Sequence, residues 1–262
     1  MSTICWIARC ERAADRGGVM LLQRGGSRRG LPDSIELDGR CLPLVVRRLP
    51  AARRLSLAAD PAKACIRLTL PRRGSLAEAT QFLEANRDWL ARRVADWPTG
   101  QPFLPGAAIP YRGQRMIIAW DRGHPRTPVV DGDNLRLGGP PEALPRRVES
   151  WLKAAAASLL AEDCAGFAAA IDRPAPMVRV GDPKTRWGSC SATGNIALSW
   201  RLVLAPDFVR RAVAAHEVAH LVHLDHSAAF HALAARLSGG TARRATRWLA
   251  EHGSGLHWVG RS

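Results

Sequence analysis

Three histidines and one glutamate near the end of the chain have the types and spacing of a site that binds a metal ion and activates water. The segment His-Glu-Val-Ala-His occupies residues 216–220, and His226 follows six residues later. On a helix, His216 and His220 are one turn apart, so both imidazoles lie on one face and can bind one divalent ion. Glu217 places a carboxylate beside that ion, where it can take a proton from water. This is the HExxH pattern of zinc-dependent peptidases, and it predicts a metallohydrolase with zinc as its cofactor.

The surroundings of the pentapeptide favour a metal site over a chance occurrence. Residues 208–215 are apolar with a helical period, which predicts a helix buried against the core. Seven of the eight histidines lie at or after position 216. Imidazole ligands suit zinc, but iron, cobalt or nickel could bind them too, so the sequence leaves the identity of the metal open.

His226 and His223 compete for the position of third ligand. On a continuous helix His223 would share the face of His216 but lie about 10 Å farther along the axis, at a rise of ~1.5 Å per residue. A metal ~2 Å from each nitrogen cannot easily bridge that span. His226 lies past the expected helix end and can fold back, so we favour it. His223 and Asp225 could then orient a ligand imidazole without binding the metal themselves. The alternative is that His223 is a residue of the helix surface and Asp225 a residue of the turn.

Two other zinc-peptidase arrangements fit less well. The spacing of ten from His216 to His226 resembles metzincins, but His223 replaces their glycine and no methionine follows Met177. A carboxylate as third ligand, as in thermolysin-like enzymes, would have to be Glu251, the only acidic residue after Asp225. We therefore keep Glu251 only as a minor alternative.

Peptide hydrolysis also needs a group that stabilises the oxyanion, and the sequence does not identify it. Arg201, His231 and His257 are the nearest candidates along the chain, and each can equally be structural. Trp187 and Trp200 can line a substrate cleft or fill the core. These residues stay open as substrate-contacting or supporting groups.

The chain as a whole predicts an α+β fold that follows a basic leader. Residues 1–34 are expected to be poorly ordered, because most of this segment is rich in Arg and Gly. Residues 35–143 are expected to form an N-terminal, antiparallel β-rich subdomain, as a meander of short strands with one helix over about 75–97. A Ser-x-x-Glu capping box opens that helix. Residues 144–262 are expected to form a mainly helical, zincin-like catalytic subdomain.

A β-hairpin is expected at the edge of the catalytic subdomain. Its strands are residues 185–190 and 195–204, separated by turn residues. The second strand directly precedes the metal helix. Such an edge strand can pair with an extended peptide or protein substrate, which predicts recognition of the substrate backbone.

The charge of +15 supports a second hypothesis from a different functional class. Part of it is compositional, because only three of the 38 basic residues are lysines in an Ala- and Gly-rich chain. The remaining field still attracts polyanions, so a basic, nucleic-acid-associated protein with a mainly structural metal site is the alternative. Its candidate phosphate-binding face consists of six arginines in the N-terminal sheet: Arg47, Arg48, Arg53, Arg54, Arg72 and Arg73. Against a structural metal, three histidines leave a coordination position open, whereas structural zinc is usually closed by four ligands.

Cysteine usage and hydropathy predict a cytoplasmic protein without a membrane segment. The six cysteines are scattered along the chain and form no CxxC pair, which fits reduced thiols. No apolar run is long enough for a transmembrane helix, and the N-terminus lacks the apolar core of a signal peptide. The sequence does not predict an oligomeric state.

The chain resembles the YgjP-like metallopeptidases, which are related to the WLM and SprT-like groups. The resemblance rests on RWGSC at 186–190, NIALSWRLVLAP at 195–206, HEVAHL at 216–221 and DHSAAF at 225–230. A weaker likeness extends back to about residue 38. The family usually has Asn in place of Asp225 and an aromatic residue in place of His231, and neither difference removes a ligand.

The resemblance implies specific roles for the site residues. It implies that His216, His220 and His226 bind zinc, that Glu217 is the catalytic base, and that the substrate is a peptide or protein. Through the SprT-like relatives it also implies a combined hypothesis, in which a protease acts on proteins bound to DNA.

Overall fold

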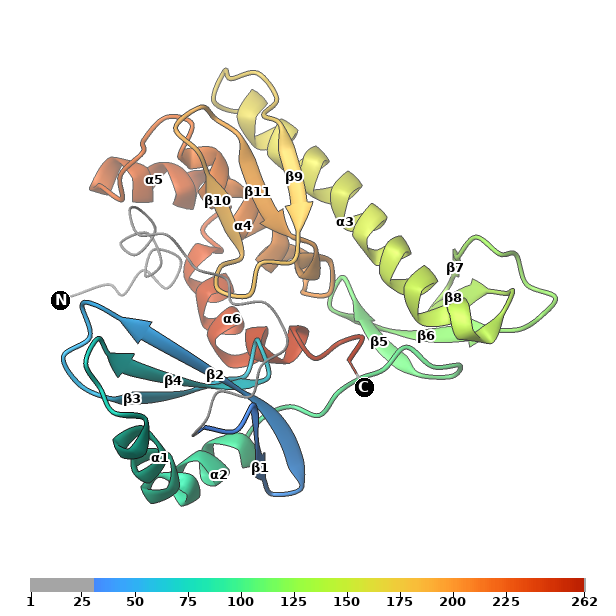
Figure 1. The fold of residues 1–262 in the computed structure, drawn as a ribbon. Coiled ribbons are helices and arrows are strands. Elements are labelled where there is room, and N and C mark those ends of the chain that lie inside the picture. The colour runs from blue at the N-terminus through green and yellow to red at the C-terminus, as the bar shows by residue number, and fades with distance from the viewer. Residues whose placement is uncertain (1–30, 262) are drawn as a thin grey trace. The chain divides into compact units, whose positions relative to one another are not determined.

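The structure is a computed structural model that describes residues 31–261 (Figure 1). Residues 1–30, which make up nearly all of the predicted leader, lie outside the described residues. The described chain divides into two compact units, residues 31–99 and residues 100–261. The sequence placed this boundary at 143/144 instead. The difference arises because the strands before residue 143 bury Ile118 and Leu135 in the same core cluster as Val148 of the helix that follows.

The smaller unit contains a four-stranded mixed sheet. Its strands follow the order β1-β2-β4-β3, where β2 and β4 are parallel and the other pairs are antiparallel. The expected meander is therefore wrong in its strand order. Strand β4 is the most buried, with Ile66, Leu68 and Leu70 fully inaccessible, so it takes a central position. The less buried β3 takes the edge. The bounds are β1 Ser34–Leu37, β2 Arg40–Leu49, β3 Ser56–Asp60 and β4 Cys65–Pro71.

Two short helices replace the single helix expected in this unit. They are α1, Leu76–Ala85, and α2, Arg87–Ala95. The capping box is confirmed, because the Ser75 hydroxyl accepts from the backbone of Ala77 and Glu78 while Glu78 accepts from the Ser75 N–H. Asn86 interrupts the helix: its side-chain amide donates to the Phe82 carbonyl oxygen at 2.7 Å, a local bond that competes with the helical pattern.

The larger unit contains two small sheets and four α-helices. One sheet has the order β5-β6-β8-β7 and the other β10-β11-β9. The strands are β5 Ala108–Tyr111, β6 Gln114–Trp120, β7 Val129–Asp131, β8 Asn134–Leu137, β9 Val178–Gly181, β10 Gly188–Cys190 and β11 Ile196–Ser199. The α-helices are α3 Leu144–Ala169, α4 Asp207–Ala219, α5 Ala228–Leu237 and α6 Ala242–Leu256, and the 3-10 turns are η1 Pro141–Ala143 and η2 Trp200–Val203.

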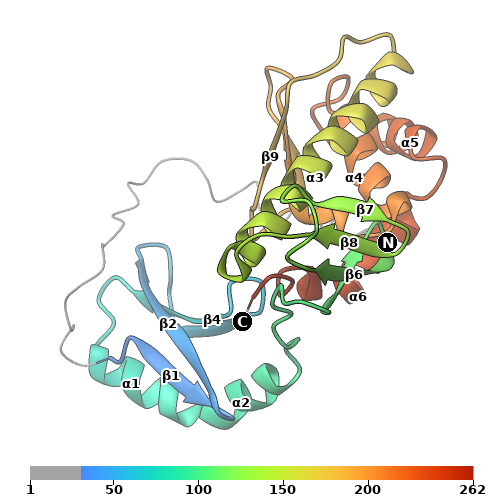
Figure 2. The same cartoon turned by 90° about the vertical axis from the view of Figure 1, so that its right-hand side faces the viewer.

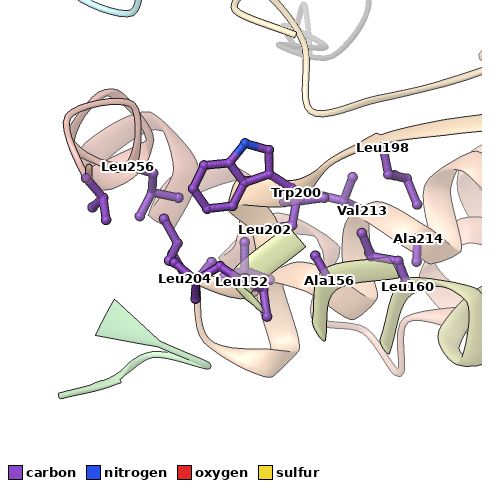
Figure 3. Close-up of a cluster of buried hydrophobic side chains, with 14 of the residues drawn as sticks. Leu152, Ala156, Leu160, Leu198, Trp200, Leu202, Leu204, Val213, Ala214 and Leu256 are labelled. Atoms are coloured by element: carbon purple, nitrogen blue, oxygen red, sulfur yellow. The ribbon is translucent and has the colours of Figure 1, made fainter. Parts of the chain in front are cut away.

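The core of this unit lies between α3, α4 and the β10–β11–β9 sheet. Figures 1 and 2 both show the long α3 beside that sheet and α4. The close-up in Figure 3 shows the indole of Trp200 among aliphatic side chains from α3, α4 and α6. The labelled neighbours are Leu152, Ala156, Leu160, Leu198, Leu202, Leu204, Val213, Ala214 and Leu256. Trp200 is 1% exposed, so it fills the core and does not line a cleft.

The predicted hairpin exists, but its second strand is not an edge. Strand β11 pairs with β10 on one side and with β9 on the other, and residues 200–203 form η2. Among the described residues, the strand next to α4 that pairs on one side only is therefore β10. The mixed α+β class is confirmed, with β-rich sheets followed by a helical C-terminal region. None of the helices in residues 31–261 is both long enough and apolar enough to span a membrane.

Candidate metal centre

Ion pairs hold the N-terminal end of the helix that carries the HExxH segment. Arg210 of α4 donates to Asp163 of α3 and to Asp207 in its own first turn, both at 2.7 Å. The Arg210 side chain is only 4% exposed. Arg112 in the β5–β6 turn makes a bidentate contact with the same Asp207. These bonds tie α4 to α3 and to β5–β6, which fixes the direction in which its far end points.

The chain turns back on itself directly after the HExxH helix. Helix α4 ends at Ala219, and His220 is its C-cap. The backbone N–H of His223 donates to the Ala219 carbonyl oxygen at 3.1 Å, which closes the turn. Helix α5 then begins under a Ser227 cap, whose hydroxyl accepts from the Phe230 N–H. This reversal brings His226 back beside α4.

The turn gathers three imidazoles at one point. His216, His220 and His226 each offer one ring nitrogen, and these atoms lie within 4.8 Å of one another. The Nε2 atoms of His216 and His226 are 3.4 Å apart. Two ligands of a tetrahedral zinc, each at ~2.0–2.1 Å, are separated by about 3.4 Å. The donor set and its spacing therefore fit a zinc ion.

Two of the imidazoles are prepared to act as ligands. The Nδ1 of His220 lies 3.0 Å from the His223 carbonyl oxygen, so an N–H there leaves Nε2 with its lone pair. Burial, with contributions from His220, His226 and His231, lowers the pKa of His216 to about 3. His216 is thus neutral near pH 7, the form in which imidazole binds a metal.

Phe230 is a site residue that the sequence analysis did not single out. Its ring centroid lies 4.8 Å from that of His216, 4.4 Å from that of His220 and 4.8 Å from that of His226. Phe230 is fully buried, and its ring is stacked on His220 at 28°. It therefore supports all three imidazoles from one side. The sequence did contain a signal for this role: Phe230 follows His226 by four residues and comes just after a helix cap.

Glu217 is packed against strand β10. The Glu217 residue is 1% exposed, and Gly188 of β10 lies directly against its carboxylate. A Cβ atom on Gly188 would lie 2.5 Å from Glu217 Oε1 and 2.8 Å from Cδ. The glycine of the RWGSC segment therefore makes room for the Glu217 carboxylate.

The remaining residues around the turn have positions that the sequence could not assign. His223 contributes its backbone carbonyl to His220, and its ring is not part of the three-nitrogen group. Asp225 is exposed and accepts from the Ser227 N–H at 3.2 Å, so it stabilises the turn. The exposed His231 ring lies 6.1 Å from that of His226.

Arg201 is engaged in structural contacts. Its guanidinium pairs with Asp182 at 2.7 Å and donates to the carbonyl oxygens of Leu256 and Val259 at 2.6 and 3.0 Å. All of its strong donors are thus directed at the C-terminal segment and the loop after β9, which excludes it as a free oxyanion donor. Trp187 is half-buried, and its ring stacks on His257 at 5.1 Å. His257 is 5% exposed and belongs to the same packed region.

Glu251 lies at the opposite end of α4 from the histidines. It is exposed and lines a cavity of about 460 Å³ with Pro206 and Phe208, at the beginning of that helix. Among the described residues, the group able to hold a metal contains the three histidines alone. The alternative with Glu251 as third ligand is therefore wrong.

Comparison with known families agrees with this site. The family model described as YgjP-like, metallopeptidase domain, matches residues 53–252, about three quarters of the chain. The matched range contains the three histidines, Glu217, Gly188 and Phe230. No curated protein and no solved structure gives a match. The chain belongs to the YgjP-like family and carries its metallopeptidase domain.

Proposed function

We propose that this protein is a zinc-dependent peptidase that hydrolyses peptide bonds with Glu217 as general base. The observation that carries the proposal is the convergence of three imidazole nitrogens within 4.8 Å, with the buried Glu217 next to His216 on the same helix. His216, His220 and His226 would hold the metal. A zinc ion bound there supplies Lewis acidity, which lowers the pKa of water towards ~7 and polarises a carbonyl group.

Glu217 has the chemistry of a proton shuttle in this site. Its carboxylate accepts the proton of the attacking water and passes it to the nitrogen of the leaving amine. The contact with Gly188 restricts the carboxylate to one position, so little reorganisation is needed when the proton moves. His231 is exposed and its ring lies 6.1 Å from that of His226, so we propose it as a substrate-contacting residue.

Strand β10 is suited to bind the substrate backbone. The Trp187 carbonyl oxygen accepts from the Ser199 N–H, and the Ser191 N–H donates to the Asn195 carbonyl oxygen, both at 2.9 Å. Hydrogen-bond direction alternates along an antiparallel strand, so the backbone groups of Gly188 and Cys190 point to the opposite side. An extended peptide added there would run directly past Glu217. This replaces the edge that the sequence assigned to residues 195–204.

The ligand set argues for catalysis rather than for a structural metal. Structural zinc sites are usually closed by four protein ligands, often cysteines. Here, within residues 31–261, the group holds three histidines and no cysteine. A three-nitrogen set leaves a coordination position for water or substrate, as a hydrolase requires.

The experiment is cleavage of an unfolded protein by the zinc-loaded full-length chain. Wild type, Glu217→Gln and Glu251→Gln are compared, and new termini are mapped by mass spectrometry. We expect cleavage by wild type and by the Glu251 control. Loss of a general base should reduce the rate of Glu217→Gln by ~100-fold or more. Equal cleavage by the Glu217 variant would contradict its role, and cleavage by none of the three would contradict the peptidase proposal.

A further inference from the structure

The strand order of the smaller unit gathers six arginines at one end of its sheet. Strands β2 and β4 are parallel, so Arg47 and Arg48 near the end of β2 lie level with Thr69 and Leu70 of β4. Arg72 and Arg73 directly follow β4. Strand β3 runs the other way, with Ser56 opposite Thr69, so Arg53 and Arg54 just before β3 lie at this end too. Figure 1 shows the arrowheads of β2 and β4 beside the loop that leads into β3.

The backbone positions of these arginines lie close to one another. The three strands are neighbours in the order β2-β4-β3, and adjacent strands are ~4.8 Å apart, so the strand ends span about 10 Å. All six arginines are exposed. We call them the arginine end of the sheet: Arg47, Arg48, Arg53, Arg54, Arg72 and Arg73.

The arginine end is almost free of compensating charge. Residues 47–59 and 61–77 contain no Asp or Glu. Asp60 lies at the other end of β3, where it pairs with Arg67 and Lys63. Glu78 is the nearest acid that follows, and its carboxylate is engaged with the Ser75 N–H in the capping box. Within residues 31–261, none of the six arginines makes an ion pair.

Arg48 has a different role from the other five. Its guanidinium donates to the carbonyl oxygen of Gly74 at 2.7 Å and contacts those of Pro71 and Arg72 at 3.4 Å. These bonds hold the segment after β4 against β2. Arg48 therefore holds the backbone that carries Arg72 and Arg73 close to the end of β2.

We propose that the arginine end binds the phosphate backbone of nucleic acid. A surface of one sign without acids fits a ligand of dense, regularly spaced negative charge, and duplex DNA carries one charge per ~1.7 Å of its axis. Arginine binds phosphate oxygens through two parallel N–H groups. Leu49 is the one large exposed apolar side chain in this cluster, which is too little to insert into a bilayer. The binding is independent of sequence, because it involves no base contacts.

The test measures binding of the full-length protein to a short labelled DNA duplex by fluorescence anisotropy as a function of salt. Two double variants, Arg53→Ser/Arg54→Ser and Arg72→Ser/Arg73→Ser, are compared with Arg92→Ser/Arg93→Ser on α2. The control removes the same charge from exposed positions of the same unit. It lies near the other end of β2, because Arg40 at the start of that strand contacts the carbonyl oxygens of Val94 and Trp97.

We expect each arginine-end variant to weaken DNA binding roughly tenfold and to reduce the salt slope by about 2, one unit per arginine removed. The control should keep wild-type affinity and slope. Replacing the same arginines by lysine should restore most of the binding. Equal loss in the control, or no binding at ~50 mM salt, would overturn the proposal. Binding of polyglutamate or anionic vesicles as tight as that of DNA would overturn the assignment to nucleic acid.

Discussion

Gly188 and Glu217 are in such close contact that residue 188 cannot carry a side chain while the carboxylate keeps its position. A Cβ atom there would lie 2.5 Å from Oε1, 2.7 Å from Cγ and 2.8 Å from Cδ of Glu217. Real Cβ atoms do not approach other heavy atoms so closely, so one of the two elements must shift. Strand β10, which we propose to bind substrate, thus leaves at Gly188 the space that the carboxylate of the proposed base fills.

Gly188→Ala should therefore impair turnover more than metal binding. The added methyl group displaces the Glu217 carboxylate, and a misplacement of about 1 Å can cost ~100-fold in rate. The three imidazoles lie outside this contact, so zinc content should remain at the wild-type value. The measurement is kcat on an unfolded protein together with zinc per chain. Gly166→Ala is the control, because a Cβ atom at Gly166 in α3 meets nothing within 4 Å. Unchanged turnover in Gly188→Ala would show that the contact does not position the base.

His226→Ala and His223→Ala should separate the two candidates for third ligand. The ring of His226 belongs to the three-nitrogen group, whereas His223 acts through its backbone carbonyl, which alanine retains. We expect His226→Ala to weaken zinc binding by more than about 100-fold, the upper loss for a supporting partner. His223→Ala should stay within a few-fold of wild type. Competition with a chromophoric chelator measures both affinities, and the reverse order would remove His226 from the site.

Phe230→Ala should lower both the stability of the metal-free protein and its affinity for zinc. Truncation of a fully buried phenylalanine costs about 3–5 kcal/mol of unfolding free energy. Loss of the support beneath three imidazoles should also weaken zinc binding ~10–100-fold, as for other residues that orient ligands. Phe167→Ala is the matched control, since Phe167 is buried on α3 beneath Arg211 and is not part of the site. Denaturant unfolding and chelator competition give the two quantities. Equal zinc affinity in both variants would reduce Phe230 to a packing residue.

The Asp182–Arg201 pair should make stability depend on pH in the acid range. Burial alone would raise the pKa of Asp182, but hydrogen bonds from Arg201 and Lys184 outweigh it and lower the pKa to about 2. A lowered carboxylate pKa contributes stability above the unfolded value of ~3.9, and this contribution is lost as the pH falls through the folded value. Arg201→Leu should lower the free energy of unfolding by ~1–3 kcal/mol at pH 7, because it removes the donor to Asp182 and to the carbonyl oxygens of Leu256 and Val259.

The difference in unfolding free energy between wild type and Arg201→Leu should then shrink between pH 4 and pH 2, because protonated Asp182 no longer gains from Arg201. Urea unfolding at several pH values measures it. Arg179→Leu, at an exposed position of β9, serves as control and should stay near wild type. If the difference in unfolding free energy stays constant over this range, the ion pair with Asp182 is not the source of the stability that Arg201 contributes.

The sequence predicted the geometry around the three histidines because that geometry is local. The i, i+4 spacing places His216 and His220 together on any helix, and the short segment to His226 permits only a tight return. The Ser75 and Ser227 caps followed from residue type in the same way. These features need no knowledge of distant parts of the chain.

Strand order and side-chain partners depended on contacts that are distant in sequence. The parallel pairing of β2 with β4, and the position of β11 between β10 and β9, follow from which strand buries most surface. Arg201 finds its partners 19, 55 and 58 residues away, at Asp182, Leu256 and Val259. An isolated Arg near a metal motif carries no signal of such contacts, so the sequence left its role open.

Zinc content paired with proteolysis, in wild type and Glu217→Gln prepared without a histidine tag, tests the proposed zinc peptidase most directly. We expect one zinc per chain in both proteins and cleavage of an unfolded protein by wild type alone, because the variant keeps the three imidazoles and loses the base. Absence of bound metal from both proteins after reconstitution with zinc, or equal cleavage by both, would contradict the proposal.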